Sequence, residues 1–158
     1  MITTLIQVVA IGSVLANAVV YGTDACFALV TRSVYDKLDD RTLTISAGWG
    51  HDYGDRRMPI VGISGVVTAI VAAVLAAISG HTAAAIAAGI AVVALVTWLG
   101  IYVRVAKPVN TQQTAAAHSG VIPANARALQ DKWNSVINAR VALQFIAVAA
   151  LCAAIALA

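Results

Sequence analysis

Charged side chains are confined to two blocks of the chain, and long apolar stretches lie outside these blocks. All ten Lys and Arg residues and all seven acidic residues lie within residues 24–57 or 104–140. Residues 1–23, 58–103 and 141–158 carry no charge and are rich in Ala, Val, Ile and Leu. A helix needs roughly 20 apolar residues to cross a hydrocarbon core of about 30 Å. The pattern therefore predicts membrane-spanning helices.

The uncharged middle stretch is long enough for two helices. Residues 58–103 have about twice the length of one span, and a Ser-Gly-His-Thr sequence at residues 79–82 interrupts the apolar pattern, as a turn would. Four spans are therefore predicted, at approximately residues 5–30, 59–78, 83–103 and 138–157. The expected fold is all-α, an integral membrane four-helix bundle that forms a single transmembrane domain over residues 1–158.

The first charged segment is expected to form a long loop with irregular structure. Apolar residues recur at helical spacing between charged residues in 33–45, which predicts a short amphipathic helix on the membrane surface. Residues 48–55 combine three glycines with two large aromatic rings. We expect this stretch to be an irregular re-entry into the bilayer.

The second charged segment is expected to break the helices again. Pro108 follows the third span and predicts a helix stop, and Gly120 with Pro123 mark a further break. Nothing interrupts a helix from Ala124 onward. The fourth helix is therefore predicted to run for about 35 residues, or about 52 Å, and its first third should project from the membrane.

The positions of Lys and Arg predict the orientation. The N-terminal stretch, the turn at 79–82 and the C-terminal end contain neither residue. Cytoplasmic loops of membrane proteins carry an excess of Lys and Arg. We therefore expect a multi-pass protein of the cell membrane, with both long polar segments and the projecting part of helix four in the cytoplasm and both termini outside.

Composition supports the lipid bilayer as the main partner and argues against nucleic acid. The chain is 61% hydrophobic and 11% charged, with a mean hydropathy of +0.88. The basic residues alternate with Asp and form no basic run with interleaved aromatics, so a nucleic-acid partner has little support. Cys26 and Cys152 fall at different depths of their predicted spans, so we expect no disulfide between them.

Polar residues within the spans indicate where function lies, because lipid offers no hydrogen-bond partners to their side chains. One stripe within roughly 80° of a helix wheel consists of Ser13, Asn17, Tyr21 and Asp24. A second stripe within about 60° consists of Trp133, Ile137, Arg140 and Gln144. Asp24 and Arg140 lie at matching depths, so they should form a salt bridge or share a polar cavity. The alternative is a pair that only fixes helix packing.

Two histidines in the polar segments are candidate metal ligands. His51 lies beside Asp52 and Asp55, and His118 lies in the other polar segment at the same expected end of the bundle. Histidine with carboxylates is a ligand set for iron or copper. The spacing matches no established metal signature, and solvated loop residues are the alternative reading. His81, in the turn at the opposite end of the bundle, is expected to lie at the interface between membrane and water.

Several of these positions together resemble a known family. They are Gly-Asp-Arg-Arg-Met-Pro at 54–59, Pro-Val-Asn at 108–110, and Leu129, Gln130, Trp133 and Arg140. In this pattern, which covers nearly the whole chain, the sequence resembles a four-span membrane family of mostly unknown function that includes the anthrone oxygenases of polyketide pathways. In anthrone oxygenases a Trp is followed four residues later by His and seven later by Arg. Trp133 and Arg140 fit this spacing, and Ile137 stands at the His position.

The resemblance implies an oxidoreductase of the monooxygenase type. Anthrone oxygenases insert oxygen into an electron-rich, fused-ring phenol without flavin or haem, so the implied substrate is a lipophilic aromatic or quinone-like molecule. On this model Asp24 is the base and Arg140 stabilises the oxyanion. The implied substrate contacts are Asn17, Tyr21, Asn110, Trp133 and Gln144. The chemistry would need either no cofactor or a transition metal, copper or iron, held by His51 and His118.

Two other classes of function stay open. In a non-catalytic accessory or assembly subunit, Asp24 and Arg140 would only hold helices together. A small-molecule carrier or binding protein would use the same polar stripes, and transport would require a homo-oligomer because four short helices leave little room for a pore. A cavity lined by both stripes favours the enzyme or the carrier, whereas dense packing there favours the accessory subunit.

Overall fold

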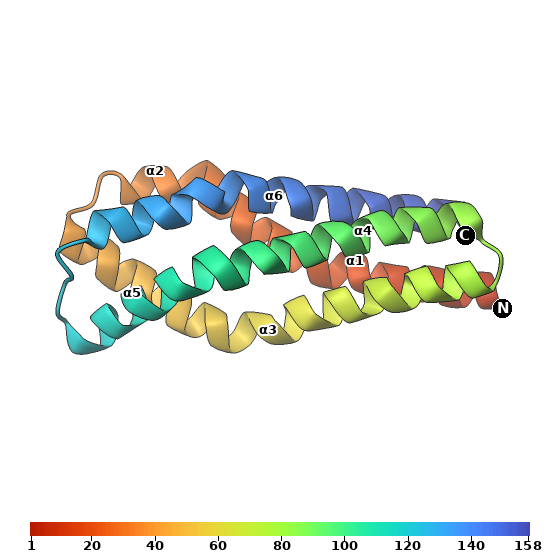
Figure 1. Ribbon diagram of the computed structural model, residues 1–158, viewed down its shortest axis with the longest axis horizontal. Coiled ribbons are helices and arrows are strands. Elements are labelled where there is room, and N and C mark those ends of the chain that lie inside the picture. The colour runs from red at the N-terminus through yellow and green to blue at the C-terminus, as the bar shows by residue number, and fades with distance from the viewer.

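The computed structural model describes all 158 residues as four long helical rods that pack side by side, and contains no strand (Figure 1). The first rod runs from α1 (Ile2–Cys26) through the π-helical turn η1 (Phe27–Thr31) into α2 (Arg32–Tyr35). The second is α3 (Asp40–Ile78), the third joins α4 (Thr82–Ile101), η2 (Tyr102–Ala106) and α5 (Lys107–Ser119), and the fourth is α6 (Ala126–Leu157). This confirms the predicted all-α fold with four long apolar helices.

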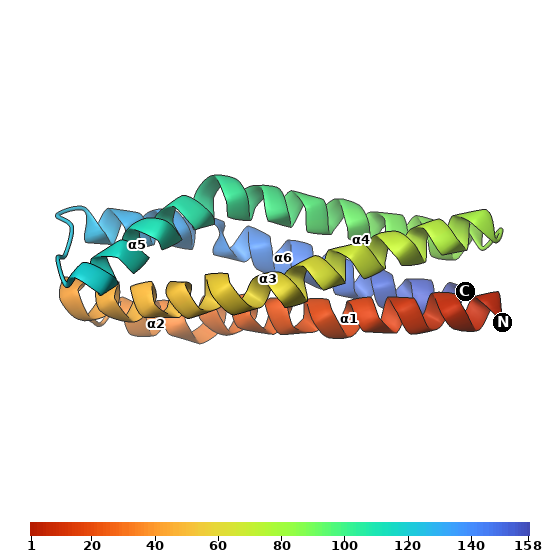
Figure 2. The same ribbon diagram turned by 90° about the horizontal axis from the view of Figure 1, so that it is seen from below.

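Both termini and the turn after α3 lie at one end of the bundle (Figures 1 and 2). The connections from α2 to α3 and from α5 to α6 lie at the opposite end. The uncharged stretches therefore share one half of the molecule and the charged segments share the other. Each rod is long and apolar enough to cross a membrane, which indicates a multi-pass membrane protein.

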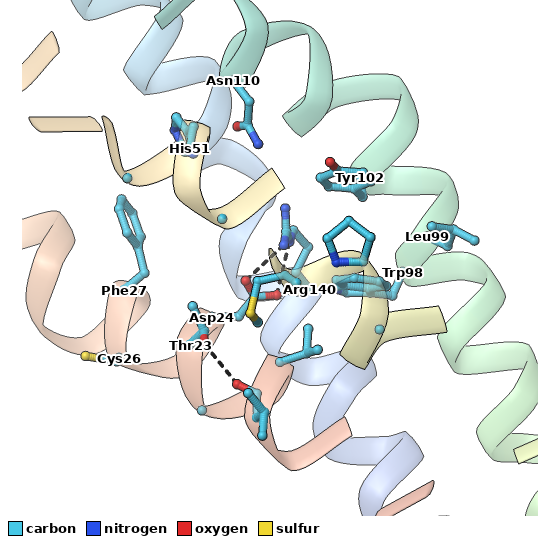
Figure 3. Close-up of a pocket in the computed structure, with 18 of the residues that line it drawn as sticks. Thr23, Asp24, Cys26, Phe27, His51, Trp98, Leu99, Tyr102, Asn110 and Arg140 are labelled. Atoms are coloured by element: carbon cyan, nitrogen blue, oxygen red, sulfur yellow. Dashed lines mark hydrogen bonds and ion pairs between the residues drawn. The ribbon is translucent and has the colours of Figure 1, made fainter. Parts of the chain in front are cut away.

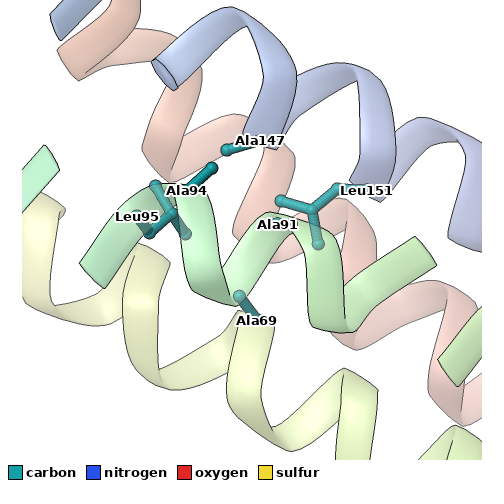
Figure 4. Close-up of a cluster of buried hydrophobic side chains, with 6 residues drawn as sticks. All are labelled: Ala69, Ala91, Ala94, Leu95, Ala147 and Leu151. Carbon is teal, nitrogen blue, oxygen red and sulfur yellow. The ribbon is translucent and has the colours of Figure 1, made fainter. Parts of the chain in front are cut away.

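Small residues make the core of the uncharged half. The largest buried cluster there consists of Ala69, Ala91, Ala94, Leu95, Ala147 and Leu151 from α3, α4 and α6 (Figure 4). Alanine allows helix backbones to approach closely, and this approach replaces the hydrophobic driving force that is absent within lipid. Large aliphatic side chains such as Leu15, Ile63 and Val93 instead point outward and are at least half exposed, as expected for a lipid-facing surface.

The long loop predicted after helix one is wrong, because α3 already begins at Asp40. Asp39 caps this helix by accepting hydrogen bonds from the Thr42 backbone N–H at 2.9 Å and from the Thr42 hydroxyl at 2.7 Å. These bonds lower the pKa of the Asp39 carboxyl. The amphipathic helix predicted over 33–45 is also replaced, since its first residues end the first rod and its last residues begin α3.

The irregular re-entry predicted over residues 48–55 is a regular part of α3. Its glycines had suggested a loop, but Gly48 serves close packing. A Cβ at Gly48 would lie 2.2 Å from the Gln113 carbonyl oxygen and 2.6 Å from the Ala117 Cβ. Only glycine lets α3 and α5 approach this closely.

Pro108 does not end a helix either. It is the second residue of α5, directly after η2, where hydrogen bonds change to the wider π-helical register. Such a local change of register can accommodate the missing N–H of proline. By contrast, α6 starts at Ala126, close to the predicted start at Ala124, and continues without a break for 32 residues.

The contact at Gly48 gives a test of the bundle. We expect Gly48→Ala to destabilise the protein by about 1–3 kcal/mol, because the added methyl group meets backbone atoms that cannot rotate away. Gly12→Ala is the matched control, since a Cβ at Gly12 meets nothing within 4 Å. Thermal unfolding in detergent measures both changes, and equal melting temperatures for the two variants would contradict this packing.

Candidate functional site

Asp24 and Arg140 form a buried, two-pronged ion pair at the border of the uncharged half. Arg140 Nη2 lies 2.9 Å from Asp24 Oδ1, and Arg140 Nε lies 3.1 Å from Oδ2. Their side chains are only 7% and 6% exposed. The Trp98 indole N–H also donates to Asp24 Oδ2 at 3.0 Å. This contact ties α1, α4 and α6 together and confirms the predicted salt bridge.

Aromatic rings surround the guanidinium group of Arg140. Its Cζ lies 5.3 Å from the ring centre of Trp98, 5.4 Å from that of Trp133 and 5.9 Å from that of Tyr102. A guanidinium at these distances is attracted by the electron-rich ring faces. The cation is therefore held by one carboxylate and several rings in surroundings that contain little water.

A second polar group lies on the charged side of this pair. Asp55 accepts hydrogen bonds from the Tyr102 hydroxyl at 2.8 Å and from Asn110 Nδ2 at 3.1 Å. The Trp133 indole N–H donates to Asn110 Oδ1 at 3.1 Å. These bonds connect α3, η2, α5 and α6, and they fix the orientation of Tyr102 and Trp133 beside Arg140.

The ion pair and this polar group border a cavity of about 940 Å³. Residues of the first rod and of α3 form most of its wall, and the rest of the wall consists of Trp98, Leu99, Tyr102, Asn110, Trp133 and Arg140. Figure 3 shows part of this wall, with Trp98, Tyr102 and Arg140 labelled. Of the 26 lining residues, 15 are hydrophobic. The cavity is thus an apolar space with a few polar groups, which is the usual character of a small-molecule site.

Glycines keep part of this space empty. Gly22 on α1 and Gly50, Gly54 and Gly62 on α3 all line the cavity. A Cβ at any of these positions would meet nothing within 4 Å. Larger side chains here would therefore enter the cavity without displacing the helices.

The structure brings only some of the predicted substrate contacts to the cavity. Asn110 and Trp133 line it, together with Asp24 and Arg140. Tyr21 instead packs near Phe145, with 6.2 Å between ring centres, and does not line the cavity.

Asn17 and Gln144 are also absent from the cavity wall, and both are buried in the helix packing. Asn17 Nδ2 donates to the Ser13 carbonyl oxygen at 2.9 Å, and its side chain fills the space over Gly65. The Gln144 amide is fully buried, and neither its oxygen nor its nitrogen has a hydrogen-bond partner. These two residues therefore lie in the helix packing and not at the expected contact with a ligand.

The two predicted metal ligands do not come together. His118 is exposed, lies 3.5 Å from Asp52 and packs against Trp49 with 4.7 Å between ring centres. His51 lines the cavity, 5.8 Å from Trp133 between ring centres. No three His, Cys, Asp or Glu side chains are grouped so that they could hold a metal ion. The metal site predicted from His51, His118 and nearby carboxylates is therefore not assembled in this structure.

Sequence reasoning missed three contributors to the site. Trp98 and Tyr102 were hidden at the end of an apolar span, although their spacing of four residues places them on one helix face. Asp55 was assigned to a loop, so its contact with Tyr102 was not expected.

Cys26 and Cys152 both carry free thiols, and both residues are exposed.

No protein-family model, curated protein or solved structure matches this chain.

Removing one partner of the Asp24–Arg140 ion pair should destabilise the protein more than removing both partners. We expect Asp24→Asn or Arg140→Gln alone to destabilise the bundle by about 3–5 kcal/mol, because each leaves a buried charge or donor without its partner. The double variant should lose less than the sum of the two single changes.

Thermal unfolding of the wild type and the three variants in detergent measures this coupling. Asp40→Asn serves as a control, since Asp40 pairs with Arg127 at an exposed position and such pairs contribute about 0–1 kcal/mol. Strict additivity of the two buried changes would show that the pair is not coupled.

Proposed function

We propose that this protein is a membrane-embedded, oxygenase-type enzyme that acts on a lipophilic aromatic or quinone-like molecule bound in the cavity. The observation that carries the proposal is the Arg140 guanidinium, which is buried among aromatic rings at the wall of an apolar space of about 940 Å³. A flat aromatic molecule suits such walls, because it can stack on Trp133 or Trp98 while a polar oxygen faces Arg140.

The size of the cavity supports a small-molecule ligand. Ligand sites commonly have about 300–1,000 Å³, so there is room for a fused-ring compound. An accessory subunit held only by helix packing has less support, because dense packing is absent beside Asp24 and Arg140.

The proposed reaction converts an activated ring CH2 group and O2 into a ring carbonyl and water. A base removes a proton from the substrate, the resulting carbanion or its phenolate form makes a C–O bond to O2, and the peroxide anion takes up the proton to give a hydroperoxide. Loss of water from the hydroperoxide then leaves the carbonyl group. Arg140 would stabilise the oxyanion that forms during this sequence.

Asp24 is best assigned to holding Arg140 in place. Both carboxylate oxygens already accept hydrogen bonds from Arg140, and one also accepts from Trp98. Asp24 would have to give up one of these bonds to act as the base proposed from sequence. Its first role in the mechanism is therefore to orient the guanidinium.

The resemblance to the family of the anthrone oxygenases supports the same class of reaction. Trp133 and Arg140, the two residues that fit the spacing of those enzymes, both line the cavity. Ile137, at the position of their His, is fully buried in an apolar cluster. Any acid–base group would therefore have to come from another helix.

Turnover and binding should both depend on the free space beside the glycines. We expect Gly62→Leu to lower binding of an anthrone and its oxygen-dependent conversion at least about tenfold, because the leucine side chain would occupy the cavity. Gly12→Leu is the control outside the cavity, and a Cβ at either position meets no other atoms. Quenching of tryptophan fluorescence reports binding, and an oxygen electrode reports turnover above the protein-free rate.

These two measurements separate the candidate functions. Arg140→Gln should lower turnover by about 10²–10³-fold if the guanidinium stabilises an oxyanion. Binding without oxygen uptake in the wild type would favour the second candidate, a binding or carrier protein. Unchanged binding and turnover in Gly62→Leu would refute the cavity as the site.

We also propose that the charged end of the bundle lies in the cytoplasm and that both termini lie outside, since that end carries the Lys and Arg residues. In a background with Cys26→Ser and Cys152→Ser, an impermeant thiol reagent added to intact cells should modify Thr82→Cys. The same reagent should leave Asp36→Cys and Ser119→Cys unmodified until the cells are lysed. The reverse pattern would invert the topology.

A further inference from the structure

His51 is a cavity residue that can accept a proton without breaking an ion pair. It lines the cavity from α3 and belongs to none of the ion pairs. The other charged groups on the wall, Asp24 and Arg140, are paired with each other, and the Tyr102 hydroxyl donates to Asp55. A neutral imidazole carries one N–H donor and one free lone pair, so its side chain can take part in an acid–base step.

A buried amide on α5 packs against the part of α3 that carries His51. Gln113 is fully buried, does not line the cavity, and its backbone carbonyl lies against Gly48, one turn before His51. Its Nε2 donates to Gln130 Oε1 at 3.1 Å, and Gln130 Nε2 in turn donates to Asn134 Oδ1 at 2.9 Å. This chain fixes the amide of Gln113, and leaves its Oε1 without a hydrogen-bond partner.

The Gln113 Oε1 has no hydrogen-bond donor, and the imidazole of His51 can supply one. A buried acceptor is stabilised by any donor within reach, and the only donor that a neutral imidazole offers is its single N–H. An N–H of His51 directed at Gln113 leaves the other ring nitrogen with a free lone pair. That nitrogen is then available to a molecule in the cavity.

We propose that His51 accepts a proton from a phenol or enol bound in the cavity and that Gln113 is the positioning residue that selects the required tautomer. In this step the ligand O–H bond breaks and an imidazole N–H bond forms, giving a phenolate and an imidazolium. The inference rests on the proposed function, since it concerns the ligand of the same cavity.

Asp55, on the same helix, and Arg140, on α6, are the charged groups near His51, and they act on its imidazolium in opposite directions. The Asp55 carboxylate favours the imidazolium, and the Arg140 guanidinium favours a phenolate oxygen that faces it. Trp133 is a neighbour of both His51 and Arg140: its ring centre lies 5.8 Å from that of His51 and 5.4 Å from Arg140 Cζ. An aromatic ring stacked on Trp133 would therefore lie near both side chains.

The test uses 6-cyano-2-naphthol, an apolar fused-ring phenol whose anion absorbs at longer wavelength than the neutral form. Tryptophan quenching reports whether the probe binds to the purified protein in detergent, and absorbance between pH 5 and 9 reports how much of the bound probe is ionised. We expect the wild type to ionise the bound probe at lower pH than the free probe. His51→Gln should bind within a few-fold of the wild type, but require about one pH unit more for the same ionisation, a tenfold change in the equilibrium.

Gln113→Leu should shift the ionisation in the same direction while leaving binding intact, as expected for a positioning residue. His118→Gln is the matched control, because His118 is exposed and lies outside the cavity wall. If His51→Gln does not fold, the 15N imidazole resonances of labelled wild-type protein replace it, and binding of the probe should move those of His51 toward the imidazolium values.

Equal ionisation of the bound probe in the wild type and His51→Gln would overturn the role of His51 but leave the cavity function standing. Unmoved His51 resonances in the presence of bound probe would do the same. Failure of the wild type to bind the probe at all would overturn both proposals.

Discussion

The buried pair of Asp24 and Arg140 sets how three of the four rods pack together. A lone ion within a span costs about 2.5–3.5 kcal/mol on insertion scales, so α1 and α6 each carry a penalty until they meet. Their bonds, at 2.9 and 3.1 Å, form only when the two helices pack at one relative depth. Trp98 adds α4 to the same contact. The ion pair therefore fixes the register of three helices and also places a guanidinium beside the cavity.

Glycine serves two opposite purposes around this pair. Gly48 and Gly65 sit where atoms of another helix lie within 3 Å of the point that a Cβ would occupy, so these residues allow close contact. Gly22, Gly50, Gly54 and Gly62 face open space within the cavity wall. Close contact at some levels of α3 and empty space at others produce a cavity in an otherwise tightly packed bundle.

This double use of glycine explains where prediction from sequence succeeded and where it failed. Charge distribution and helix periodicity were enough to predict the four rods and the meeting of Asp24 with Arg140, because both follow from one-dimensional patterns. Glycine is common both in turns and where two helices pack closely. The glycines of residues 48–55 therefore did not distinguish a loop from a helix. Only the position of Gln113 across the interface resolves that choice, and it depends on the tertiary fold.

The same limit applies to the polar part of the site. Because residues 48–55 were predicted to be irregular and Pro108 was predicted to end a helix, His51 and Asp55 could not be placed on a helix face near Asn110. The structure extends α3 and α5 well beyond the uncharged half.

This extension is what lets the bundle hold a polar site next to an apolar one. Loops at this level would leave Asp55 and His51 mobile, whereas continuous helices hold them at fixed positions above the ion pair. The cavity consequently joins two environments. Its uncharged side is lined by exposed apolar residues such as Val19 and Ile63, which suit the proposed lipophilic ligand, and its charged side holds His51 and Asn110. A reaction that needs both a membrane-soluble substrate and proton transfer is best served at such a border.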